Sequence, residues 1–100
     1  MKDIIDCPAE RAVYFIGGKW KIRILFNLSS KKKARFGELK RNLKTITQQM
    51  LSKQLKELKQ DGIVNRKVYQ IVPPKVEYSL IKFGRSGISV LKSLFEWESK

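Results

Sequence analysis

The sequence contains no histidine, and it has only one cysteine, Cys7, in 100 residues. Without histidine, the common Ser-His-Asp triads and most zinc hydrolase sites cannot be assembled. A single cysteine cannot form an internal disulfide, which favours a reducing compartment, and we expect the cytoplasm. Because no motif for a cofactor or a metal is present either, we predict that the protein is not an enzyme.

Long apolar runs and a nucleotide-binding loop are also missing. No stretch approaches the roughly 18 consecutive apolar residues that a membrane span needs, and residues 1–9 lack the apolar centre of a signal peptide. The segment Gly17-Gly18-Lys19 resembles the end of a phosphate-binding loop, but that loop requires Gly where Val13 stands and Ser or Thr where Trp20 stands. The sequence therefore predicts neither a membrane protein nor this type of nucleotide site.

Acidic residues are scarce: nine Asp and Glu stand against 22 Lys and Arg, and the formal net charge is +13. A surface that only has to be soluble carries a net charge of about 2 to 8. The excess predicts a polyanionic partner, which is DNA, RNA or an anionic membrane. The length predicts one domain over residues 1–100, and a domain this small would gain useful burial by forming a dimer.

The apolar pattern predicts a mainly α chain with a small antiparallel β-hairpin. Helices are expected over residues 8–16, 19–28, 36–43 and 48–61, with a last, apolar helix that begins beyond Gly84. Strands are expected over residues 63–72 and 75–80, separated by Pro73-Pro74 because proline has no N–H to donate to a ladder. Two short helices joined by a tight turn and followed by a hairpin indicate a winged helix-turn-helix.

Both ends of the predicted helix 48–61 carry local signals. Thr47 is a good N-cap, since its hydroxyl can accept a hydrogen bond from a free N–H of the first turn. Ile46 and Leu51 have the spacing of a hydrophobic staple. At the other end, Gly62 can take the left-handed conformation that stops a helix, and Ile63 can fold back on the last turn.

The outer face of this helix is the predicted DNA-reading surface. Leu51, Leu55 and Leu58 form its apolar stripe, and the opposite face carries no acid. Because a recognition helix presents its N-terminal half to base edges, the candidate base-reading residues are Gln48, Gln49, Ser52 and Lys53. Lys56 lies further along and is predicted to meet phosphates. The alternative is an ordinary solvated helix face.

Further basic residues are candidates for phosphate contacts. Arg66, Lys67 and Lys75 lie on the predicted hairpin, and Arg35 follows a predicted loop that starts at Lys31. The alternatives are a solvated hairpin whose lysines block edge pairing and a solvated loop. About five to eight phosphate contacts would give a logarithmic salt dependence of about −5 to −7 for duplex DNA.

Short segments spread over nearly the whole chain form a specific set: Cys7-Pro8, Ile16-Gly17-Gly18-Lys19-Trp20, Arg35-Phe36, Asp61-Gly62, Val72-Pro73-Pro74-Lys75-Val76-Glu77-Tyr78-Ser79-Leu80 and Gly84-Arg85. This set resembles the HxlR-type family of bacterial transcriptional regulators. The resemblance implies a winged-helix homodimer that binds a two-fold operator in double-stranded DNA. The chain departs from the family in one turn, which often carries Pro-Gly and here reads Lys44-Thr45, so no base preference is carried over.

The resemblance also implies roles for the chain ends. It places the dimer interface on the first and last helices, in agreement with the apolar residues there: Val13, Ile16, Ile88, Leu91, Leu94 and Phe95. The alternative is that these residues only fill the core. Some family members sense oxidants or electrophiles through the cysteine that aligns with Cys7, which requires an exposed thiol with a favoured thiolate; a plain packed cysteine is the alternative. The sequence does not identify a small-molecule effector, and a pocket at the dimer interface stays open.

Two other functions share the positive charge. A nonspecific architectural nucleic-acid-binding protein would need no base-reading face, and it would bind random duplex as well as any operator. An RNA-binding module would need exposed aromatic residues for stacking. Because Trp20, Phe36 and Phe95 fall on predicted inward stripes, the RNA-binding function ranks last.

Overall fold

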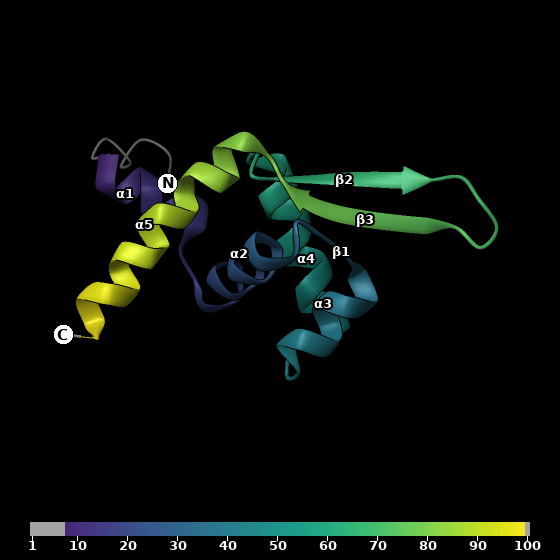
Figure 1. Cartoon of the computed structure of the whole chain (residues 1–100), viewed down its shortest axis with the longest axis horizontal. Helices are drawn as coiled ribbons and strands as arrows, with labels where there is room; N and C mark the ends of the chain where they lie inside the picture. Colours follow the sequence, from purple (N-terminus) through teal and green to yellow (C-terminus); the bar gives the residue numbers. More distant parts are fainter. Residues whose placement is uncertain (1–7, 100) are drawn as a thin grey trace.

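The computed structural model describes residues 8–99, and in them a mainly helical chain carries one small sheet (Figure 1). The elements are α1 (Pro8–Ile16), α2 (Lys19–Lys31), β1 (Lys33–Arg35), α3 (Phe36–Leu43), α4 (Gln48–Gln60), β2 (Val64–Tyr69), β3 (Lys75–Leu80) and α5 (Lys82–Glu98). The strands are antiparallel in the order β1-β3-β2. Helices α3 and α4 with the β2–β3 hairpin form the predicted winged helix-turn-helix.

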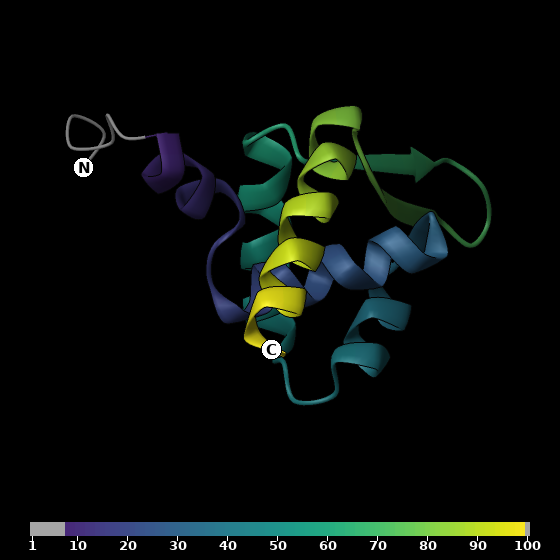
Figure 2. The ribbon, with the colours of Figure 1, turned by 60° about the vertical axis from the view of Figure 1, so that its left-hand side comes forward.

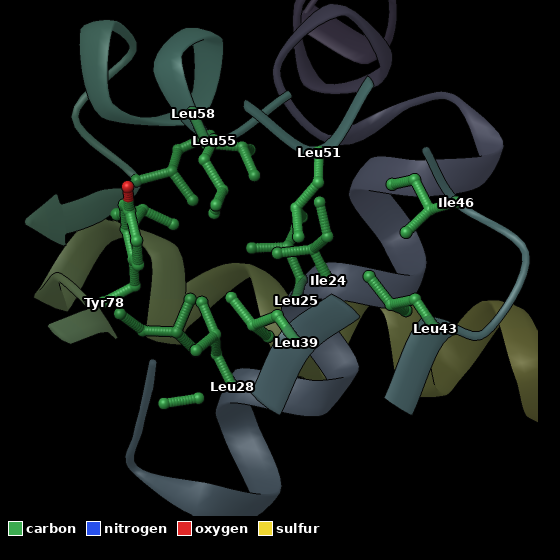
Figure 3. Packing of buried hydrophobic residues seen from close by; sticks show 14 of the residues in the cluster. Ile24, Leu25, Leu28, Leu39, Leu43, Ile46, Leu51, Leu55, Leu58 and Tyr78 are labelled. Carbon is green, nitrogen blue, oxygen red and sulfur yellow. The ribbon is translucent and has the colours of Figure 1, made fainter. Parts of the chain in front are cut away.

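The core lies between α2, α3 and α4 and under the sheet (Figure 3). Apolar side chains of α2 and α3 pack against the apolar stripe of α4. They are Ile24, Leu25 and Leu28 from α2, Leu39 and Leu43 from α3, and Leu51, Leu55 and Leu58 from α4. Tyr78 of β3 closes this core on the side of the sheet. Each fully buried leucine contributes about 1.5–3 kcal/mol through removal of apolar surface from water. The predicted inward stripe of α4 is confirmed, and its opposite face is turned away from the core.

The first correction concerns the segment Lys33–Arg35, which was expected as a loop and is strand β1. It pairs with β3, and Ala34 lies opposite Tyr78. Ala34 is buried, whereas Lys33 and Arg35 on either side of it are exposed. Three residues are too few for a period of two to be visible in a sequence. The strand also fixes the direction of the two basic side chains, which share one face of the sheet.

The limits of three other elements differ from the prediction. Helix α2 continues to Lys31, three residues beyond the expected end, and β2 covers only Val64–Tyr69. Helix α5 begins at Lys82, so Gly84 lies inside it rather than before it. The cause is packing, because Gly84 is buried against the carbonyl oxygen and side chain of Ile63. A glycine that permits a close approach looks, in sequence, like a helix breaker.

The residues predicted for the dimer interface differ in their burial. Ile88 and Leu91 of α5 are 7% and 2% exposed and belong to the core of the chain itself, which leaves them almost no surface for a partner. Val13, Leu94 and Phe95 are exposed. The side chain of Ile16 lies outside the described part of the structure, as does Cys7. The predicted set thus divides into inward and outward residues.

The hairpin and α5 point in different directions from the central helices. Strands β2 and β3 extend as a wing to the right of Figure 1, and the last turns of α5 extend to the lower left. Figure 2 shows α5 crossing in front of the helical core, while α1 lies to one side. The aromatic rings of Phe15 and Phe83 pack edge to face with 5.8 Å between their centroids, and this contact connects α1 to the first turn of α5.

Candidate nucleic-acid interface

The N-terminus of α4 is held by the two predicted local devices. The Thr47 hydroxyl accepts a hydrogen bond from the backbone N–H of Met50 at 3.1 Å. Ile46, just before this cap, and Leu51, in the first turn, are both buried in the core. The cap satisfies one of the free N–H groups at the helix start, and the two apolar side chains set the entry angle. The first turn of α4 is therefore fixed in position.

The C-terminus of α4 ends as the sequence predicts. The N–H of Ile63 donates to the carbonyl of Leu58 at 3.0 Å, and the N–H of Gly62 donates to Lys59 at 3.1 Å. Gly62 has φ of 75°, the left-handed conformation that glycine adopts without strain. These two bonds form a Schellman motif. The motif turns the chain directly into β2, so helix α4 and the β2–β3 hairpin are joined by a short, hydrogen-bonded turn.

The five candidate residues on α4 are all exposed: Gln48, Gln49, Ser52, Lys53 and Lys56. Within the part of the chain that the structure describes, the side chains of Gln48, Gln49 and Lys56 form no hydrogen bond or ion pair. Their donors and acceptors are therefore available to a partner. The structure brings these residues together on one side of a helix whose ends are fixed, which is the arrangement that base reading in a major groove requires.

A groove connects α4 to the wing. It has a volume of about 230 Å³ and is lined by Ser52, Lys56 and Lys59 from α4 and by Arg66 and Tyr78 from the sheet. Three cationic side chains thus surround one concave surface beside the base-reading candidates. A groove with several positive charges attracts and concentrates anionic groups such as phosphates. Among the predicted wing residues, Arg66 is the one that lines the groove together with residues of α4.

The other predicted wing and loop residues lie on the opposite face of the sheet. Arg66 is paired with Tyr78, whereas Arg35 and Lys67 are both paired with Glu77. Because consecutive side chains of a strand point to opposite faces, Arg35 and Lys67 share the face of Glu77 and not that of Arg66. Lys75, two residues before Glu77, is on this second face too. The structure therefore separates the nine predicted DNA-contacting residues into two groups.

Glu77 organises this second face, and sequence reasoning did not identify it. One carboxylate oxygen lies 3.3 Å from Lys75 Nζ, and the other lies 3.7 Å from Lys33 Nζ. Desolvation raises the pKa of Glu77, but hydrogen bonds from Tyr69 and Lys75 and the nearby positive charges outweigh it, and the net effect is a lowered pKa. The carboxylate therefore stays ionised among the cations.

Lys75 is held by this cluster rather than presented to solvent. Its ammonium lies over the ring of Tyr69, 4.7 Å from the centroid, in addition to its ion pair with Glu77. Lys67 contacts the same ring at 4.9 Å. Position 77 could have been noticed in the sequence, since the expected hairpin places an acid across from basic residues. The signal is weak because it depends on the strand register.

Among residues 8–99, no group of three or more Cys, Asp or Glu side chains gathers in a way that could hold a metal ion. None of the helices α1 to α5 is long and apolar enough to cross a membrane.

Comparison with known proteins gives a consistent result. The family model described as HxlR-like helix-turn-helix matches residues 15–100. The uncharacterized HTH-type transcriptional regulator YdeP of Bacillus subtilis is 47% identical over 98 residues, which cover 98% of this chain and 76% of that protein. A second regulator of this type from the same organism, YtcD, is 52% identical over 92 residues, which cover 92% of this chain and 72% of that protein.

Solved structures are similar over nearly the full length. The redox regulator HypR in its oxidized form has a TM-score of 0.85 and 48% sequence identity, covering 94% of this chain and 97% of that chain. Its reduced form has a TM-score of 0.87 and 46% sequence identity, covering 93% of this chain and 91% of that chain. The arrangement of helices, sheet and wing is therefore shared with experimentally determined proteins.

Proposed function

The chain belongs to the HxlR-like helix-turn-helix family, and we propose that it regulates transcription as a homodimer bound to a two-fold operator in double-stranded DNA. One observation carries this proposal: the exposed N-terminal half of α4, fixed at both helix ends, lies beside a groove that contains Arg66. Its relatives are HTH-type transcriptional regulators. Action on chromosomal DNA would place the protein in the cytoplasm.

The residues of α4 divide into two roles. Gln48, Gln49, Ser52 and Lys53 read base edges, because Gln can pair with adenine through two hydrogen bonds and Lys can reach the acceptors of guanine. Lys56 and Arg66 contact the phosphates on either side of the groove. Phosphate contacts set the position of the protein on the duplex, and base contacts provide the sequence preference.

The homodimer is supported by apolar surface on the terminal helices. Val13 on α1 and Leu94 and Phe95 on α5 are exposed, and so are Phe83 and Trp97 on α5. Large apolar side chains grouped on a surface are typical of protein–protein interfaces. A two-fold axis through these helices would place the two α4 helices about one DNA turn apart, roughly 34–36 Å, or a multiple of that distance.

Redox control through Cys7 is a second part of the proposal. It is supported by the 48% identity to a protein named redox regulator HypR. We expect Cys7→Ser to leave binding in the reduced state nearly unchanged and to abolish the effect of an added oxidant such as diamide. An oxidant that releases wild-type protein and the variant from DNA equally would overturn this part.

The decisive experiment selects binding sites from genomic fragments with the purified protein and then measures competition with random duplex. A specific regulator should prefer its operator by about 10³-fold or more. A preference near one would instead indicate an architectural protein, and tighter binding to single-stranded RNA would indicate an RNA-binding module. Light scattering on the same preparation gives the mass, and a monomer that still binds one half-site would exclude the homodimer.

A further inference from the structure

A second concave surface lies away from the proposed DNA interface. It has a volume of about 420 Å³ and is formed by α2, the end of β3 and α5; no residue of α4 contributes to it. Its apolar lining is Leu28, Leu80 and Ile88, and its cationic lining is Lys32, Arg85 and Lys92. None of the lining residues is acidic. We call this surface the α5 cavity.

The cations of the α5 cavity have no anionic partner in the described chain. Lys32 and Lys92 form no ion pair within residues 8–99. Arg85 donates one hydrogen bond from Nη1 to the carbonyl oxygen of Leu80 at 2.9 Å, which anchors its guanidinium beside the cavity and leaves other N–H groups free. Like charges that face one cavity without compensation favour the binding of an anion.

The backbone at Lys32 is a second observation. Its φ is 65°, and it is one of two non-glycine residues with positive φ in the described chain. This region is unfavourable for a residue with a Cβ, and such conformations are concentrated at ligand and functional sites. The conformation connects the end of α2 to β1 and holds Lys32 at the cavity.

We propose that the α5 cavity binds a small aromatic carboxylate. The small exposed parts of Leu28, Leu80 and Ile88, extended by the aliphatic stems of Lys32 and Lys92, give the cavity an apolar wall that can hold a flat apolar body. The carboxylate would lie among Lys32, Arg85 and Lys92, where Arg85 can form a two-pronged, charge-assisted contact. The volume is in the range of about 300–1,000 Å³ that is usual for small-molecule sites. A DNA phosphate has no apolar body to cover this wall.

A second copy of the chain would not have to cover this cavity. Arg85 and Lys92 are seven residues apart on α5 and therefore lie on nearly the same side of the helix. Val90 and Leu94, which are exposed, are each two residues from Lys92 and so lie about 160–200° around the helix from it. The side of α5 that carries Val90 and Leu94 thus faces away from the cationic edge, whereas the exposed Phe95, three residues from Lys92, lies about 60° from it.

The position of the cavity gives a ligand a regulatory effect, which rests on the proposed function. The site is shared between α5 and the α2–β3 part of the DNA-reading unit. A ligand bound between them stabilises one arrangement of α5 relative to α2. If α5 joins two subunits, this arrangement sets the spacing of the two recognition helices. A ligand then changes operator affinity by the ratio of its own affinities for the two arrangements.

The test uses 1-naphthoate as the probe and the intact protein without DNA. Calorimetry should show saturable binding with a dissociation constant below about 1 mM, and neutral 1-naphthamide should bind at least about tenfold more weakly because it lacks the charge. Lys92→Gln should weaken naphthoate binding by about five- to tenfold, and so should Lys32→Gln. The matched control is Lys82→Gln on the same helix, outside the cavity, which should bind as wild type.

Three results would overturn the site: no saturation by naphthoate, equal affinity for the neutral amide, or equal affinity in the Lys92→Gln, Lys32→Gln and Lys82→Gln variants. The regulatory part is tested separately by operator binding with and without naphthoate. If naphthoate binds and operator affinity does not change, the regulatory effect is wrong and the site stands. If the protein shows no operator preference at all, the proposed function fails, while the calorimetry still decides the site.

Discussion

Lys21 of α2 and Glu57 of α4 form an ion pair, with 2.9 Å between Lys21 Nζ and Glu57 Oε1. The Lys21 side chain is 13% exposed and that of Glu57 is 38% exposed. The hydrogen bond from Lys21 is the main cause that lowers the pKa of Glu57; desolvation opposes it, and the charges of Lys21 and Lys53 add to it. The ion pair connects α4 to α2.

We expect Glu57→Gln to lower the free energy of unfolding by about 0.5–1 kcal/mol at pH 7, in the range for a partly exposed ion pair. Because the pKa is lowered in the folded state, the stabilisation is complete above the ordinary glutamate value of about 4.3 and is lost as the pH falls through the lower folded value. Urea unfolding should therefore show a gap in the free energy of unfolding between wild type and variant at pH 7 that is smaller at pH 3.

The control for this pair is Glu96→Gln, since Glu96 is exposed on α5 and has no ion pair among the described residues. Glu96→Gln should change the free energy of unfolding little at either pH value. An equal gap for Glu57→Gln at pH 7 and pH 3 would show that the charge of Glu57 does not stabilise the fold.

The cap of α4 gives a second expectation. Thr47→Ala removes the acceptor for the N–H of Met50 and should cost about 1 kcal/mol of stability. Thr45→Ala is the matched control, because the exposed Thr45 side chain has no hydrogen bond among the described residues. Chemical denaturation of the two variants measures the difference. Equal stabilities would mean that water replaces the cap without cost.

The ends of α4 could be predicted from sequence because every signal for them is local. Thr47, Ile46 and Gly62 act within one helical turn of their own positions, and the structure shows each in its expected place. Strand β1 is different, because Ala34 becomes part of a sheet only by pairing with Tyr78, 44 residues later. A propensity or period in three residues does not contain that information.

The candidate site was predictable to the same extent. The exposed residues of α4 follow from the helix period, so Gln49 and Lys53 could be identified. The faces of the wing depend on register, and therefore the separation of Arg66 from Lys67 and the role of Glu77 appear only in the structure. A register shift of one residue would exchange the two faces.

Gly84 provides a test of the packing that sequence reasoning misread. A Cβ at this position would meet the carbonyl oxygen of Ile63, so Gly84→Ala should destabilise the protein by about 1–3 kcal/mol through overpacking. Gly37 is the matched control: it is also helical, and a Cβ there would meet only the Arg41 side chain at 3.7 Å. Gly37→Ala should stabilise by about 0.5 kcal/mol. Thermal unfolding that ranks the two variants the other way would contradict the close contact.

The two faces of the wing should differ in DNA binding. Arg66→Gln should weaken binding to operator and random duplex alike and reduce the salt slope by about two, as expected when each subunit of the dimer loses one phosphate contact. Lys75→Gln removes the same charge, but its ammonium is held by Glu77 and Tyr69, and we expect a smaller loss of affinity. Binding titrations at several salt concentrations give both slopes. A loss for Lys75→Gln as large as that for Arg66→Gln would place the outer face of the sheet at the DNA as well.

The last expectation concerns sequence reading by α4. Gln49→Ala and Lys53→Ala should each reduce operator affinity by about 1–3 kcal/mol and leave affinity for random duplex much less affected, because a base contact is lost only on the correct sequence. Gln60→Ala is the control, since Gln60 is exposed on the same helix but in its last turn, away from the end that enters the groove. The ratio of operator to random-duplex affinity measures the effect. A ratio that stays constant in both variants would show that Gln49 and Lys53 touch only the backbone, and the reading of bases would then have to come from Gln48 and Ser52 or from the shape of the DNA.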